Sequence, residues 1–197
     1  MTARLVPAIA GALPGLVLAG IGLVHPHDLA PATAGHWITL HVWLVPIFPL
    51  LGLALLIPGW TAPRWARILL AALIFLYVVY YGALDAVAGI GAGIAVQRNQ
   101  VRGDVDHWLL EVGNSLGWVG SIAFLAAALL VAALVFRRVR GPALIPGLIL
   151  VGASVSFLNS HIYAPRGVIT VLLIGLATGW LTWVAGRRSP GTTTSPG

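Results

Sequence analysis

Six histidines and five carboxylates are the side chains of this sequence whose types could bind metals or carry out catalysis. There is no cysteine, which excludes thiolate catalysis, disulfides and iron–sulfur clusters. Imidazole and carboxylate together form the ligand set that Zn, Fe, Mn and Cu use in proteins. The question is therefore whether the chain brings these side chains together.

Helical spacing places several of them on shared faces. His107 and Glu111 are four residues apart, so both lie on one face of a helix, where the carboxylate can fix the tautomer of the imidazole. Tyr77, Tyr81 and Asp85 follow the same spacing and form one polar stripe.

From these patterns we predict a metal site built from some of the histidines and two acids, with ligands drawn from His25, His41, His107, His161, Asp85 and Glu111. One haem is the alternative, with His41 and a second histidine as axial ligands. In either case the expected cofactor is a transition-metal ion or a haem, and the expected chemistry is redox or hydrolytic, on a lipidic substrate.

Asp85 also supports a different hypothesis. It lies within an apolar stretch, and a carboxylate at membrane depth is usually part of an ion site or a proton relay. Asp85 and Glu111 are accordingly the candidate catalytic residues. A small proton-coupled transporter centred on Asp85 remains open, as does a non-catalytic subunit of a larger membrane complex.

The elements that must position these residues are predicted from composition. The 197 residues are 59% hydrophobic and 8% charged, and the mean hydropathy is +0.96. A single globular core of this size cannot enclose that much apolar surface, so most of it must face lipid. Six stretches approach or reach the length of a spanning helix, namely 5–24, 38–57, 68–96, 108–136, 143–159 and 168–185.

The positions of the arginines predict how the helices are oriented in the membrane. All eleven basic residues are arginines, and eight of them fall on one side of the six predicted helices. Because cytoplasmic loops carry the excess of basic residues, we predict an all-α, six-transmembrane-helix bundle in a bacterial inner membrane, with both termini cytoplasmic. Residues 1–188 form the single domain and residues 189–197 a disordered tail. The net charge of +6 is then explained by the arginines that set the membrane topology, and no nucleic-acid partner is expected.

With this topology every histidine and every acid maps to the extracytoplasmic half. Since arginine and lysine are kept out of translocated loops, part of this clustering follows from topology alone. Polar groups at membrane depth nevertheless face the bundle interior or a wet cavity, so we expect an outward-facing polar pocket. The expected partners are the lipid bilayer and, through the GxxxG spacings at Gly11, Gly89 and Gly175, a membrane protein or a second copy of the chain.

Overall fold

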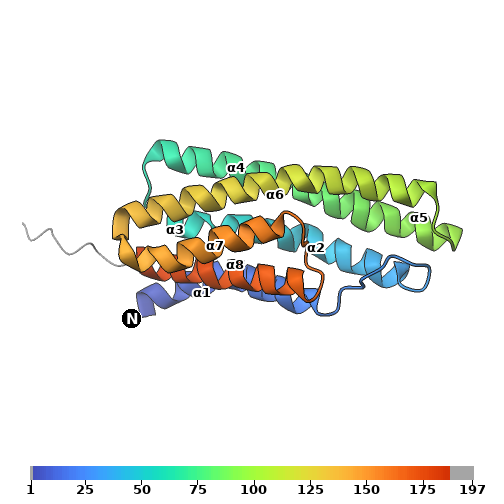
Figure 1. The fold of residues 1–197 in the computed structure, drawn as a ribbon, viewed down its shortest axis with the longest axis horizontal. Helices are drawn as coiled ribbons and strands as arrows, with labels where there is room; N and C mark the ends of the chain where they lie inside the picture. Colours follow the sequence, from blue (N-terminus) through green and yellow to red (C-terminus); the bar gives the residue numbers. More distant parts are fainter. Residues whose placement is uncertain (1, 187–197) are drawn as a thin grey trace, which may run out of the picture.

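The structure is a computed structural model that describes residues 2–186, and within that range it is helical with no strand (Figure 1). The long helices are α1 (Thr2–Gly22), α2 (Ala34–Ala54), α4 (Arg64–Leu84), α6 (Asp104–Val139), α7 (Leu144–Phe157) and α8 (Arg166–Ala185). The short elements are α3 (Leu56–Gly59), the π-helical η1 (Asp85–Gly91), α5 (Ala92–Asn99) and the 3₁₀ turn η2 (Gly141–Ala143). The prediction of an all-α fold is confirmed. The predicted tail at 189–197 lies outside the described residues.

Five helical stretches are long and apolar enough to cross a membrane: Ala3–Gly22, Ala34–Gly59, Arg64–Asn99, Asp104–Val139 and Arg166–Ala185. Large apolar side chains stay exposed along them, as for Val6 (71%) and Phe75 (65%), which is the surface expected to face lipid. The sixth predicted stretch is also helical, but α7 has 14 residues and spans only about 21 Å. The neighbouring helices α6 and α8 are longer than α7 and extend beyond it.

The start of α1 and the end of α8 lie side by side because the two helices pack against each other in opposite directions. A Cβ on Gly15 would come within 2.6 Å of the Cα of Gly175, and Gly186 lies against the side chain of Arg4. The GxxxG spacings at Gly11 and Gly175 therefore serve contact between helices of the same chain, and the spacing at Gly89 does so as well, against His41 and Ile38 of α2. Association through these faces with another protein stays a prediction.

The bundle has two chemically different ends. We call the end with the termini, the α3–α4 connection and the end of α6 the arginine end; it holds Arg4, Arg64, Arg67, Arg137, Arg138 and Arg140. The opposite end, here the histidine end, is made by the connections 23–33, 100–103 and 158–165 and by α5 with the start of α6 (Figure 1).

Hydrogen bonds join two of the connections at the histidine end. Asp106 is 2% exposed and accepts hydrogen bonds from Arg102 and from the backbone of Gly103, each at 2.5 Å. Arg102 also donates to the carbonyl of Leu29 at 2.9 Å. The 23–33 connection is thereby tied to the turn between α5 and α6.

Aromatic rings fill the core below these connections. Phe48, Tyr77, Phe124 and Phe157 are almost fully buried and contact one another or Tyr81. The hydroxyl of Tyr77 donates to the carbonyl of Phe48 at 3.1 Å. This aromatic layer packs directly against the polar side chains of the histidine end.

Candidate metal site

Three histidines from distant parts of the chain meet at the histidine end. His25, His41 and His161 each offer a ring nitrogen, and these nitrogens all lie within 4.8 Å of one another. The rings touch edge to face or in parallel, with centroids 5.1 Å apart for His25 and His41 and 5.7 Å apart for His25 and His161. We call these three residues the histidine cluster.

Each member is held by a different element. His41 lies in the second turn of α2, whereas His25 and His161 lie in the connections 23–33 and 158–165. The two connections are adjacent. A Cβ on Gly22, at the end of α1, would come within 2.5 Å of the carbonyl oxygen of Ile162. His161 has a φ of 41°, in the left-handed region that few non-glycine residues adopt.

The π-helical turn η1 packs directly on His41. A Cβ on Gly89 would lie 2.2 Å from Cδ2 of His41, so only glycine fits at this position. Trp37, one turn before His41, stacks beside its ring at 4.9 Å and lies with its indole nitrogen 3.4 Å from the carbonyl of Ala88. Single π-helical turns are common at functional sites, and this one sets the position of an imidazole.

Hydrogen bonds leave the same nitrogen of two rings available. Nδ1 of His25 lies 2.7 Å from the carbonyl of Pro26, and Nδ1 of His41 lies 2.8 Å from the carbonyl of Trp37. A carbonyl can only accept, so both Nδ1 atoms carry the hydrogen and both Nε2 atoms keep a lone pair. This is the arrangement of metal-binding histidines, whose second N–H is donated to a carbonyl or carboxylate.

His161 is held by a tyrosine. Its Nδ1 lies 2.8 Å from the hydroxyl of Tyr81. Because a hydroxyl both donates and accepts, it can take the Nδ1–H of His161 and leave Nε2 free for a metal. The Nε2 atoms of His161 and His25 are buried without a hydrogen-bond partner, which is rare for polar atoms in proteins.

Burial favours the neutral form of His25 and His161. His25 is 4% exposed, and its loss of solvation is the main cause that lowers its pKa to about 4. Burial, with His25 and His41 nearby, also lowers the pKa of His161. Since metal binding requires unprotonated imidazole, these two rings are in the metal-binding form at neutral pH.

Asp85 is buried next to this region. The side chain is 0% exposed, and neither carboxylate oxygen has a hydrogen-bond partner. Asp85 lies one turn after Tyr81, which bonds to His161, and one turn before Gly89, which contacts His41. The predicted stripe of Tyr77, Tyr81 and Asp85 is confirmed as a buried face.

The other two predicted ligands lie elsewhere. Nε2 of His107 is 3.2 Å from Oε1 of Glu111, so the predicted pair one helical turn apart forms. Both side chains are 65% exposed on the first turns of α6. The structure does not bring them to the histidine cluster, and the cluster is the one group of potential metal ligands found within residues 2–186.

A cavity of ≈ 290 Å³ adjoins the cluster at His161 and Tyr81. It lies where the short α7 ends, between α6 and the 158–165 connection. Its polar lining consists of hydroxyl, amide, indole and imidazole groups, and none of the described residues that line it carries a carboxylate or guanidinium. The polar members are Tyr81, Asn114, Trp118, Ser121, Asn159, Ser160, His161 and Tyr163. A small uncharged molecule fits this chemistry.

Several residues of the site were missed by sequence reasoning. Trp37 and Tyr163 surround His25, with ring centroids 5.1 Å and 4.7 Å from it, and Gly89 supports His41. The sequence signals are weak. Trp37 lies near the start of an apolar stretch, where interfacial tryptophans are common. Tyr163 lies in a connection, and Gly89 belongs to a common small-residue spacing.

No known protein family, characterised protein or solved structure matches the chain.

Proposed function

We propose that this chain is a multi-pass membrane protein that binds one transition-metal ion through His25, His41 and His161. The observation that carries the proposal is the convergence of three ring nitrogens within 4.8 Å, with the Nδ1–H of His25 and His41 directed to carbonyls. Three nitrogens bound to zinc at about 2.0–2.1 Å lie roughly 3.3 Å apart, so the widest spacing closes by about 1.5 Å when the ion binds.

The orientation we propose follows the charge asymmetry. The arginine end is cytoplasmic, because loops rich in arginine are retained on that side. The six helical segments then span or enter the membrane, both termini are cytoplasmic, and the histidine cluster opens to the extracytoplasmic side. The histidine site takes its ion from outside the cytoplasm.

The ligand set favours zinc or copper. Three neutral imidazoles suit Zn²⁺ and Cu²⁺ and leave at least one position for water or substrate. A haem fits less well, since the ring of His25 contacts those of both His41 and His161 and so occupies the space that a porphyrin between them would need. The chemistry is then hydrolytic with zinc or redox with copper, on a small molecule admitted through the cavity at His161.

Asp85 supports a cation site for an electrostatic reason. A fully buried carboxylate without a hydrogen bond is costly in a bundle facing lipid. A divalent ion held by three neutral ligands carries an uncompensated charge of +2. The carboxylate of Asp85 offsets part of that charge, and each group lowers the cost of burying the other.

The experiment is elemental analysis of the detergent-purified protein, prepared without chelators or nickel resin. We expect near-stoichiometric zinc or copper in the wild type and loss of that metal in His25→Ala, His41→Ala and His161→Ala. His107→Ala and Glu111→Ala are matched controls, because they remove an exposed pair at the same end. A folded, metal-free wild type that takes up neither Zn²⁺ nor Cu²⁺ overturns the proposal.

The second candidate is a proton-coupled carrier centred on Asp85. The unpartnered buried carboxylate favours it, because such a group exchanges protons readily when a path to water opens. A carrier requires Asp85 for pH-dependent transport and retains function when the histidine cluster is removed. Transport assays on Asp85→Asn and His41→Ala proteoliposomes separate the two candidates.

A further inference from the structure

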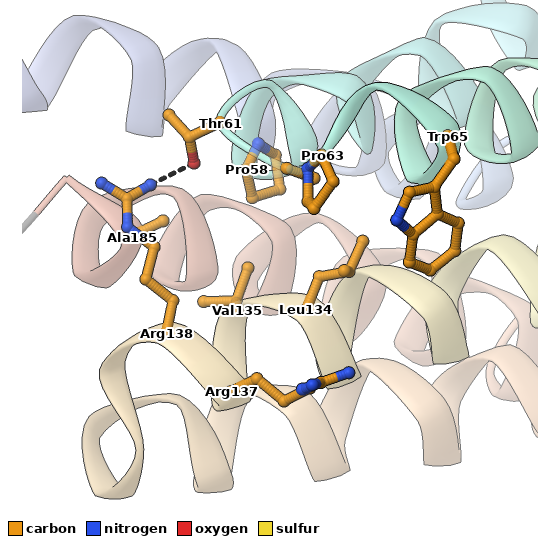
Figure 2. A pocket seen from close by; sticks show the side chains of 10 residues that line it. Pro58, Thr61, Pro63, Trp65, Leu134, Val135, Arg137, Arg138 and Ala185 are labelled. Carbon is orange, nitrogen blue, oxygen red and sulfur yellow. Dashed lines mark hydrogen bonds between the residues drawn. The ribbon is translucent and has the colours of Figure 1, made fainter.

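A second pocket of ≈ 370 Å³ lies at the arginine end, away from the histidine cluster (Figure 2). Thirty residues of α6 separate His107 from Arg137, which corresponds to about 45 Å along the helix. The pocket is formed by the α3–α4 connection and the ends of α6 and α8. It is therefore independent of the proposed metal site.

Two arginines give this pocket its charge. Arg137 and Arg138 are consecutive residues near the end of α6, and both line the pocket. Arg138 donates a hydrogen bond to the hydroxyl of Thr61, whereas the guanidinium of Arg137 points away from Thr61 (Figure 2). Among the described residues that line the pocket, none carries a carboxylate, and the five acids of the sequence occupy other positions. The pocket thus carries positive charge suited to a phosphate group.

Apart from Thr61, the rest of the lining is mainly apolar. Pro58, Pro63, Leu134 and Val135 line the pocket together with the arginines (Figure 2). A ligand that fills the pocket must therefore combine an anionic group with apolar surface.

Two further hollows extend this apolar lining along the bundle. A hollow of ≈ 480 Å³ between α1, α3 and α8 shares Pro58, Thr61 and Ala185 with the pocket. A hollow of ≈ 370 Å³ between α1 and α2 shares Ile57 with the second. The three hollows follow one another from the arginines through these shared residues, and their lining is mainly apolar, with the hydroxyl groups of Thr61 and Thr182 among it. We call this lining the apolar path; it matches an acyl chain.

The tryptophans place this path at a membrane surface. Trp60 is 68% exposed and Trp65 is 60% exposed, and Arg67 lies over the ring of Trp60 at 5.8 Å. Exposed tryptophans at the ends of apolar helices lie at the level of lipid headgroups. The guanidinium groups of the pocket are then at the depth of lipid phosphates.

We propose that this pocket binds an anionic phospholipid, with the headgroup phosphate held by Arg137 and Arg138 and an acyl chain in the apolar path. Basic pockets between transmembrane helices recognise anionic headgroups in this way. The apolar continuation distinguishes a lipid from a free phosphate, which has nothing to place there.

The test measures lipid bound to the full-length protein by native mass spectrometry, with phosphatidylglycerol and phosphatidylcholine offered in equal amounts. We expect a preference for phosphatidylglycerol that falls by about tenfold or more in Arg137→Gln/Arg138→Gln, given the usual strength of hydrogen bonds to charged groups. The matched control is Arg64→Gln/Arg140→Gln, which removes the same charge at the same end outside the pocket.

A second variant keeps both arginines. Ala62→Trp fills the pocket from the α3–α4 connection and should also abolish the preference. Equal loss in the control pair, no loss in Ala62→Trp, or displacement of the lipid by millimolar inorganic phosphate overturns the proposal. The metal content of every variant should equal that of the wild type, so failure here and failure of the metal site are separate results.

Discussion

The hydroxyl of Tyr81 and Nδ1 of His161 lie 2.8 Å apart although 80 residues separate them in the sequence. This contact joins α4 to the 158–165 connection and orients the ring of His161 toward His25 and His41. It makes Tyr81 the residue through which the helix bundle sets the geometry of the histidine cluster.

Removing that hydroxyl should weaken metal binding. We expect Tyr81→Phe to lower the affinity for Zn²⁺ by about 10- to 100-fold, the usual effect of losing a partner of a metal-bound histidine. Tyr77→Phe is the control, because its hydroxyl bonds to the Phe48 carbonyl and not to a histidine. That variant should lose about 1 kcal/mol of stability and keep its affinity. Competition titration against a zinc indicator measures both, and equal affinities for the two variants contradict the role of Tyr81.

Gly89→Ala should displace His41. The added methyl would lie 2.2 Å from Cδ2 of the imidazole, and relieving such overpacking costs about 1–3 kcal/mol, or roughly tenfold or more in metal affinity. Gly82→Ala is the control, since a Cβ there meets nothing within 4 Å. Metal content and thermal melting in detergent are measured for both variants. Unchanged zinc binding in Gly89→Ala would show that the site tolerates movement of His41.

Asp85→Asn removes the negative charge of Asp85 and leaves the size of the side chain nearly unchanged. If the carboxylate offsets the charge of a bound ion, the variant should melt at or above the wild-type temperature without metal and gain less from added Zn²⁺. Melting curves with and without the ion test this. An undiminished zinc-induced shift would mean that Asp85 does not act on the metal.

Gly15→Leu should separate α1 from α8. Its side chain would meet the carbonyl oxygen of Val171 at 2.5 Å and the backbone of Gly175 at 2.6 Å, and we expect a loss of stability of about 1–3 kcal/mol or more. Gly20→Leu is the control on the same helix, with nothing within 4 Å of its Cβ. Thermal melting in detergent reports the loss. If the two variants melt alike, the contact between Gly15 and Gly175 contributes little to stability.

The helices and their apolar surfaces were determined by the sequence itself, because both depend on local patterns. The stretches 5–24, 38–57, 68–96, 108–136, 143–159 and 168–185 all correspond to helical segments. The arrangement of Tyr77, Tyr81 and Asp85 on one face also follows from helical periodicity. The range 143–159 is already the shortest of the six predicted stretches, in keeping with the short α7. Local composition did not reveal that the chain forms a π-helical turn at Asp85, since this depends on packing against neighbouring helices.

Only the tertiary structure decided which histidines meet. His25 and His161 lie in connections whose backbone direction no periodicity describes, and they are brought together because α1 and α8 pack side by side through glycines. His107 and Glu111 satisfy the same spacing rule as Tyr81 and Asp85, yet α6 presents them to the surface. Spacing fixes which residues share a helical face, whereas the rotation of each helix in the bundle fixes where that face points.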